Sequence, residues 1–376
     1  MAEYLIFLTI STSIFALFGL GLNLQWGFTG LINFGHVAFM TLGAYTTTLL
    51  TLKGIPIPLS ALIGAIVAAF LGLIIGFSTL RLREDYLAIV TIGVGEVIRL
   101  VVNNQNLPVG NEWKPGSFGV QSYPIPLATL VPNIFVKLLM IALLTLLAVI
   151  SLWQLWRWIR ASQQLHADSN KKTAKKQEFI SRLIVGILLA LLIVAIYISG
   201  AVSLYNYTPS AGLMLLSLIV LAFVFWRLEI LLRSPWGRIL KAIREDEEIP
   251  KALGKNVFWY KLQSLMLGGA IAGISGAFFA WQLAAIYPDN FQPQITFDAW
   301  IMIILGGSGN NLGTILGAVI YFIYYEGTRN LDRIIALDAD RLSALRIMII
   351  GLLLMVLMIS RPQGILGKKE ELTLGK

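Results

Sequence analysis

The chain has 376 residues, of which 57% are hydrophobic and only 13% charged, and its mean hydropathy is +0.77. So much apolar surface excludes an ordinary soluble domain and predicts an integral membrane protein, whose cytoplasmic loops account for the formal net charge of +9 better than nucleic-acid binding does. Cysteine is absent, which excludes disulfides, thiolate catalysis and cysteine metal sites.

Apolar runs long enough for a helix to cross about 30 Å of hydrocarbon recur along the chain. Because a chain in hydrocarbon must satisfy its own backbone hydrogen bonds, we predict an all-α, polytopic helical membrane protein with about 9 to 10 transmembrane or re-entrant helices. Residues 1–376 are expected to form a single transmembrane domain. The expected segments are 4–24, 27–50, 59–80, 86–104, 134–156, 181–200, 211–228, 261–286, 297–326 and 343–360.

The first apolar run follows Met1 closely and has neither a basic start nor a small-residue cleavage site, so we interpret it as a span and not a signal peptide. Lysine and arginine collect in four stretches, which the positive-inside rule assigns to the cytoplasm. These stretches are Arg81 with Arg83, 157–182, 227–261 and 361–376. The pattern predicts an N-terminus outside the cell and a C-terminus in the cytoplasm.

The second and fourth segments carry polar residues that need partners inside a membrane. His36 lies beside Asn33 in a glycine-rich stretch, where a buried, hydrogen-bonded histidine is commoner than one lining a pathway. Glu96 and Arg99 are three residues apart and therefore share a helical face, where each can neutralise the other. Both a pathway or gating pair and a structural pin between helices are compatible with this spacing.

Residues 134–200 contain two apolar runs around a hydrophilic tip. We expect 157–180 to be a basic cytoplasmic loop, solvated and mobile, because the tip combines high charge with few apolar residues. His166 in this tip has no neighbours suited to binding a metal. With two histidines in the whole chain, we expect no metal site.

The basic loop 233–261 has the pattern of an amphipathic cytoplasmic helix and not of a linker. Acidic residues from Glu245 to Glu248 suit a helix N-terminus, Pro250 suits a first turn, and Gly254 suits the position just past a helix end. A short exposed helix of this kind is able to act as a lever seated in another protein.

Glycines mark two further features of the membrane region. In 297–326 they interrupt an apolar run together with two asparagines, which favours a re-entrant pair of half-helices buried in protein. Asp298 opens that run at what we expect to be the outer face, next to an expected outer segment, 326–345. Three glycine pairs four residues apart predict close helix packing: Gly72 and Gly76, Gly269 and Gly273, Gly313 and Gly317.

Several of these stretches together resemble the LivM-type permeases of ABC transporters for branched-chain and neutral amino acids. That family's cytoplasmic signature is matched by Ser234, Gly237, Arg238, Ala242, Ile243, Arg244, Glu247, Ala252 and Gly254, although Pro250 stands where a small residue is usual. Four other stretches extend the resemblance to roughly 25–104 and 227–365: 27–45, 86–104, 268–280 and 305–318. Between 105 and 226 the resemblance weakens, which suggests an additional hairpin at 134–200.

The resemblance implies a fold and a set of partners. The fold would be that of a type II-like ABC importer permease, and 233–261 would hold the coupling helix that docks on an ATP-binding subunit, with the signature residues making that contact. The partners would be a homologous second permease, two ATP-binding subunits and a periplasmic substrate-binding protein in a bacterial inner membrane. This chain has no G-x-x-x-x-G-K-[ST] phosphate loop, so ATP and Mg would be bound by the partner ATPase and the chain itself is not expected to be an enzyme.

Three alternatives stay open. Urea or short amides are the second substrate class of related importers. An ion- or proton-coupled secondary transporter would also place ionisable residues and broken helices near mid-membrane, but it has no need of the 233–261 signature. A passive channel ranks last, because no stretch resembles a selectivity filter.

Overall fold

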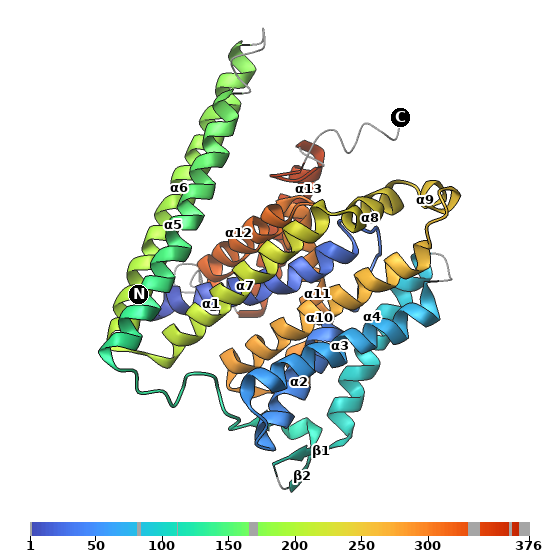
Figure 1. Cartoon of the computed structure of the whole chain (residues 1–376), viewed down its shortest axis with the longest axis vertical. Coiled ribbons are helices and arrows are strands. Elements are labelled where there is room, and N and C mark those ends of the chain that lie inside the picture. Colours follow the sequence, from blue (N-terminus) through green and yellow to red (C-terminus); the bar gives the residue numbers. More distant parts are fainter. Residues whose placement is uncertain are drawn as a thin grey trace. The chain divides into compact units, whose positions relative to one another are not determined.

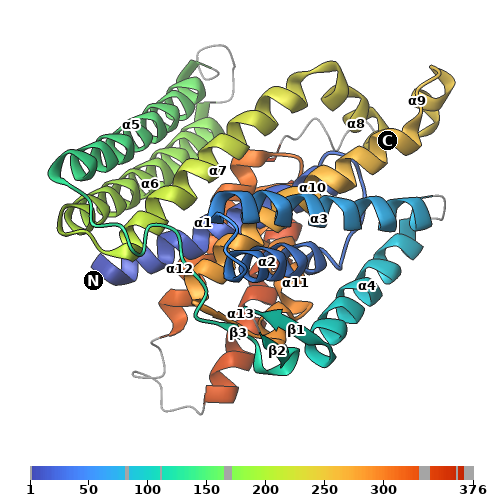
Figure 2. The same ribbon diagram turned by 60° about the horizontal axis from the view of Figure 1, so that its bottom comes forward.

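The computed structural model describes residues 2–80, 84–110, 112–164, 172–329, 339–360 and 363–367, most of them helical (Figure 1, Figure 2). Two compact units divide the chain. The first comprises Met1–Ile10 and Leu127–Ile219, and the second comprises Ser11–Pro126 and Val220–Lys376. Arg81, Arg83 and His166 lie outside the described residues.

The helices in chain order are α1 (Ala2–Gln25), α2 (Val37–Leu52), α3 (Ile57–Thr79), α4 (Glu84–Asn104), α5 (Ile134–Gln164), α6 (Lys172–Asn206), α7 (Pro209–Arg233), α8 (Pro235–Glu245), α9 (Glu248–Ala252), α10 (Val257–Leu283), α11 (Gln294–Gly306), α12 (Asn311–Arg329) and α13 (Ala339–Ser360). Among the described residues, seven helices are long and apolar enough to cross a membrane, and the α11–α12 pair raises the number to eight. The predicted polytopic helical membrane protein is therefore confirmed.

In the first unit, α5 and α6 run side by side as a long helical pair (Figure 1). Lys137 on α5 donates to the carbonyl oxygen of Tyr205 on α6 at 2.9 Å, near one end of the pair. The helices extend beyond the predicted boundaries, because α5 continues to Gln164 and α6 begins at Lys172. Much of the expected loop 157–180 is thus helical, since its alanines, lysines and glutamines are good helix formers even where they are too polar for lipid.

The second unit is built around α2, α3 and α10, which pack tightly against one another (Figure 2). Their backbones come close because glycines stand at the crossings: a Cβ added to Gly43 of α2 would lie 2.2 Å from the carbonyl oxygen of Gly273 on α10. A Cβ added to Gly72 of α3 would likewise lie 3.1 Å from the carbonyl oxygen of Leu265 and from the Cα of Met266 on α10. The predicted packing role is confirmed for Gly72 and Gly273, whereas Gly43 was not among the predicted pairs.

The predicted second segment, 27–50, is wrong as a single helix. The chain leaves α1 at Gln25 and re-enters a helix only at Val37, and the stretch 26–36 between them is irregular and largely buried. Glycine and small polar residues weaken the helix here, and Gly30 adopts a φ of +82° that side chains rarely permit. Buried hydroxyls satisfy the irregular backbone: Thr91 accepts from Phe34 N at 3.1 Å, and Thr296 accepts from Val37 N at 3.0 Å.

The predicted interruption of 297–326 is confirmed. The axes of α11 and α12 differ by 116° across a break at 307–310 (Figure 2). The last carbonyl groups of α11 are satisfied by a later part of the chain, because Ile365 N and Leu366 N donate to the carbonyl oxygens of Leu305 and Gly306.

Two small antiparallel strand pairs were not predicted. The hairpin β1 (Asn106–Val109) and β2 (Glu112–Pro115) follows α4. After the short turn η1 (Gly116–Phe118), β3 (Val120–Gln121) pairs with β4 (Ala285–Ile286), which follows α10 and precedes the turn η2 (Pro288–Phe291). The segments that follow α4 and α10 therefore lie at the same end of the second unit.

Candidate functional site

The candidate site is the segment that joins α7 to α10, where α8 presents one apolar and one charged face. Gly237, Leu240 and Ile243 recur every three residues and are buried, whereas Arg238 and Lys241 are exposed. Position 237 requires glycine, because a Cβ there would lie 2.3 Å from the carbonyl oxygen of Leu232. The buried face fixes α8 on the second unit and directs the charged face outward.

The short helix α9 is held by a cluster of lysines and glutamates. Lys251 Nζ lies 2.6 Å from Glu247 Oε1 and 2.9 Å from Glu248 Oε1, and Lys261 of α10 also pairs with Glu247. Burial raises the pKa of Glu247, but hydrogen bonds from Lys251 and Lys261 outweigh it and hold that pKa below its usual value. The hydrogen bonds that Lys251 donates to Glu247 and to Glu248 raise the pKa of Lys251.

The predicted end of this loop helix is confirmed at Gly254, which follows α9 with a φ of +71°. Pro250 lies in the first turn of α9, so its departure from the family pattern costs no backbone hydrogen bond. The expected acidic helix start is confirmed in part, because Glu248 opens α9, whereas Glu245 ends α8, the helix that carries most of the amphipathic pattern.

Sequence reasoning missed the two apolar side chains that α9 and its following turn expose. Ile249 is 57% exposed and Leu253 is 73% exposed, on a support fixed by the three ion pairs of Glu247 and Lys251. Ala252 and Gly254 of the signature are exposed beside them. The sequence could have indicated this surface, because isolated apolar residues within a charged loop commonly mark the site where a partner protein binds.

Arg244 makes a long-range contact within the second unit. Its guanidinium turns back toward the second unit, where Nη1 donates to the carbonyl oxygen of Gly27 at 2.5 Å. Gly27 belongs to the irregular stretch after α1, more than 200 residues earlier in the chain. The sequence therefore placed Arg244 correctly on the loop but gave no indication of its inward direction.

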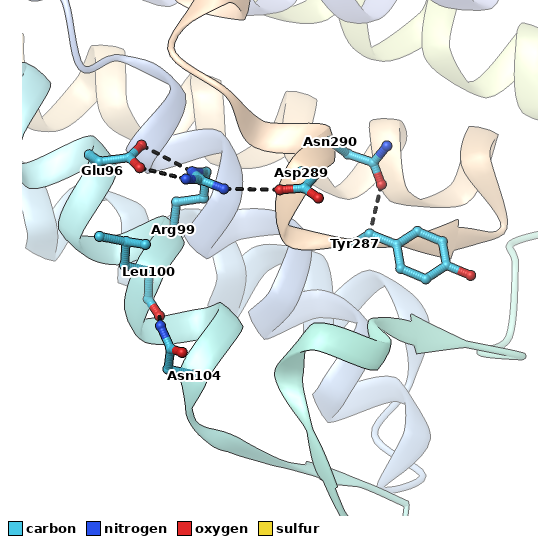
Figure 3. Close-up of polar contacts among 7 residues, drawn as sticks. All are labelled: Glu96, Arg99, Leu100, Asn104, Tyr287, Asp289 and Asn290. Carbon is cyan, nitrogen blue, oxygen red and sulfur yellow. Dashed lines mark hydrogen bonds and ion pairs between the residues drawn. The ribbon is translucent and has the colours of Figure 1, made fainter.

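Glu96 and Arg99 form the expected ion pair, with Arg99 Nη2 2.5 Å from Glu96 Oε1 (Figure 3). A third partner was missed: Arg99 Nη1 lies 3.0 Å from Asp289 Oδ1 on η2. The Asn290 side chain shapes that turn by accepting from Tyr287 N at 2.7 Å (Figure 3). Arg99 thus connects α4 to η2 as well, and the role of the pair, in a pathway or as a structural pin, stays a prediction.

Asn33 and His36 lie in the interior and are fully buried. Asn33 donates to Gln25 Oε1 at 2.8 Å, and its carbonyl oxygen accepts from Trp300 Nε1 at 3.2 Å. The His36 ring packs against Phe18, with ring centroids 4.7 Å apart. His36 is thus buried as we expected, with its Nδ1 3.5 Å from Asn33 Nδ2, whereas its Nε2 meets no hydrogen-bond partner among the described residues. No group of His, Asp and Glu suited to a metal occurs among the described residues.

Comparisons with known proteins add an independent result. A family model described as "Branched-chain amino acid transport system / permease component" matches residues 4–158 and 139–358. The high-affinity branched-chain amino acid transport system permease proteins LivM of Escherichia coli (strain K12) and Salmonella typhimurium are each 29% identical over 94% of this chain and 68% of theirs. No solved structure matches.

A probable branched-chain amino acid transport permease protein LivM of Methanocaldococcus jannaschii is also 29% identical, over 42% of this chain and 46% of its own. The family match includes the 134–200 hairpin, whereas the sequence motifs had traced the resemblance only through 25–104 and 227–365. The middle of the chain is therefore part of the similarity.

Proposed function

Because the chain belongs to the family of branched-chain amino acid transport system permease components, we propose that it is the membrane-spanning permease subunit of a binding-protein-dependent ABC importer for neutral or branched-chain amino acids. The names of its relatives support this substrate class. ATP hydrolysis with its Mg ion is assigned to a partner subunit, and this chain moves the solute.

The observation that carries the proposal is the surface on α9. Ile249 and Leu253 project from a short helix that the ion pairs of Glu247 hold in place. An apolar tip on a charged, rigid support suits insertion into a groove of another protein, because the tip loses water on docking while the support keeps its shape. We assign this groove to the ATP-binding subunit.

The remaining partners and the location follow from the same assignment. A homologous second permease completes the pathway, two ATP-binding subunits meet the loops containing α8 and α9, and a periplasmic binding protein delivers substrate at the opposite face. The chain then spans the bacterial inner membrane with its N-terminus outside and its C-terminus in the cytoplasm, consistent with the basic residues of the α7–α10 segment.

A reconstituted complex tests the proposal. Proteoliposomes that contain this chain and its genomic partners should take up radiolabelled leucine only when ATP and loaded binding protein are present. Leu253→Asp should abolish uptake while the permease still reaches the membrane, because a charge cannot enter an apolar groove. Val131→Asp, at an exposed residue of the first unit, is the matched control and should leave uptake intact.

The same assay separates the alternatives. Uptake that survives ATP depletion but collapses with an ion gradient would replace the proposal by a secondary transporter. Competition by urea but not by leucine, proline or glycine would keep the importer and change its substrate class.

A further inference from the structure

Both irregular breaks of the second unit meet at one point. A Cβ added to Gly27, in the break after α1, would lie 2.6 Å from the backbone nitrogen of Gly309, in the break between α11 and α12. Asn23, which is fully buried, joins them as well, because its Oδ1 accepts from Gly309 N at 3.0 Å. Two interruptions almost 300 residues apart in sequence are thus in close contact, and the second is bonded to the end of α1.

Arg244 of α8 reaches this same point. Its Nη1 donates to the carbonyl oxygen of Gly27, and a Cβ added to Gly309 would lie 2.7 Å from that nitrogen. Gly30 packs on the backbone of Arg244, since a Cβ there would lie 3.6 Å from the arginine Cα. The C-terminal end of α8 therefore contacts both breaks through one guanidinium and one close backbone approach.

Buried amides extend the connection to two more helices. Asn23 Nδ2 donates to Asn311 Oδ1 at 3.2 Å, and Asn311 Nδ2 donates to Glu229 Oε1 of α7 at 3.2 Å. Asn23 and Asn311 are almost completely buried, so losing any of these bonds leaves a polar group without water to replace its partner. The ends of α1, α7, α8 and α12 thus share one polar cluster.

We propose that Arg244 is a positioning residue that ties α8 to the two breaks, so that a displacement of α8 is delivered to both interrupted segments together. This inference rests on the proposed function, in which α8 and α9 receive the movement of an ATP-binding subunit. Its role differs from the docking contact implied by the family signature, because the side chain binds within this chain. Broken helices are suitable receivers, since their backbone is held by side chains and not by a continuous helical ladder.

The first experiment compares Arg244→Gln with Arg227→Gln in the reconstituted complex. Both changes remove one cation from the same end of the molecule, but Arg227 is exposed on α7 and stacks only on Trp226 among the contacts described for it. Arg244→Gln should raise the ATP hydrolysed per leucine transported about tenfold or more, the factor expected for losing one hydrogen bond to a charged group. A residue with a purely structural role would lower hydrolysis and transport in proportion and leave that ratio unchanged.

A covalent tether supplies the second experiment. The chain has no native cysteine, and a Cβ added to Gly30 would lie 3.9 Å from the Cβ of Arg244, a Cβ–Cβ separation within the range of disulfides. In the double variant Gly30→Cys/Arg244→Cys, the reduced protein should be uncoupled, and oxidation should restore the ratio of ATP to leucine toward the wild-type value. Gly30→Cys alone reports any effect of the strained position.

The outcomes are separable. If Arg244→Gln matches Arg227→Gln, or if the oxidised tether stays as uncoupled as the reduced form, the positioning role is wrong while the importer assignment stands. If the wild-type complex shows no ATP-dependent uptake, the proposed function itself fails. Coupling restored by the disulfide supports a mechanical tie, because the tether returns the connection without returning the charge.

Discussion

At the scale of single residues, the three members of the Arg99 cluster should differ in what they contribute to stability. Arg99→Leu leaves Glu96, which is 37% exposed, without its two hydrogen bonds from the guanidinium and should cost about 1 to 3 kcal/mol. Asp289→Asn should cost about 1 kcal/mol or less, because Asp289 is 79% exposed and its ion pair is screened by water. Thermal unfolding of the purified protein in detergent measures both, and equal losses would contradict the assignment of Glu96 as the principal partner.

Glu247 should give the loop an acid-sensitive contribution. A carboxyl group whose folded pKa lies below its unfolded value of 4.5 contributes stability that is fully present above pH 4.5 and is lost as the pH falls through the folded pKa. The wild-type protein should therefore lose more thermal stability than Glu247→Gln on acidification below pH 4.5. Parallel melting curves for the two proteins would show that the lysine contacts do not act on this carboxylate.

These residues also show what sequence could and could not provide. The Glu96–Arg99 pair was predictable because a spacing of three residues fixes two side chains on one helical face. Asp289 was not, because it lies 190 residues from Arg99 and approaches it only through the packing of η2 near α4. Arg244 was identified by its motif, but the direction of its guanidinium depends on the position of Gly27, which no local pattern encodes.

At the scale of helices, two glycines in predicted spans provide a matched test of the packing. Gly43→Ala places a methyl group 2.2 Å from the Gly273 carbonyl oxygen and should destabilise the protein by about 1 to 3 kcal/mol through overpacking. Gly93→Ala on α4 meets no atom within 4 Å and should stay within about 0.5 kcal/mol of wild type. Unfolding midpoints in detergent decide between them, and a tolerated Gly43→Ala would mean that α2 and α10 lie further apart.

The helix boundaries were predictable wherever hydropathy alone decides them, as for α1, α3 and α4. They were wrong where tertiary contacts replace the helical ladder, as in 26–36, where Thr91 accepts from Phe34 N, and at the start of α2, where Thr296 accepts from Val37 N. The break at 307–310 was predictable because four glycines and two asparagines are concentrated in 306–313, whereas 26–36 dilutes the same residue types among apolar ones. Strands β1 to β4 are only two to four residues long, so they produced no periodic signal.

At the scale of the molecule, contacts within the second unit constrain which segments share a face of the membrane. The β3–β4 pairing and the Arg99–Asp289 ion pair place the segment after α4 and the segment after α10 at one end. The α7–α10 segment precedes α10 and therefore lies at the other end. The hydrogen bond from Arg244 to the carbonyl oxygen of Gly27 places the C-terminal end of α1 at that same end. The composition predicted the same division independently, through the cations of 227–261.

Labelling of single cysteines in this cysteine-free chain turns that division into a prediction. A membrane-impermeant thiol reagent added to intact cells should modify Lys114→Cys on β2 and should not modify Lys255→Cys after α9, although both side chains are exposed. Permeabilised cells should label both, which controls for reactivity. Because α10 crosses once between Lys255 and β4, labelling of both positions from outside would mean that α10 does not span the membrane or that the contacts joining β3 to β4 are absent there. Labelling of Lys255→Cys alone would invert the topology, and the exposed tip of α9 would then be unable to reach any ATP-binding subunit.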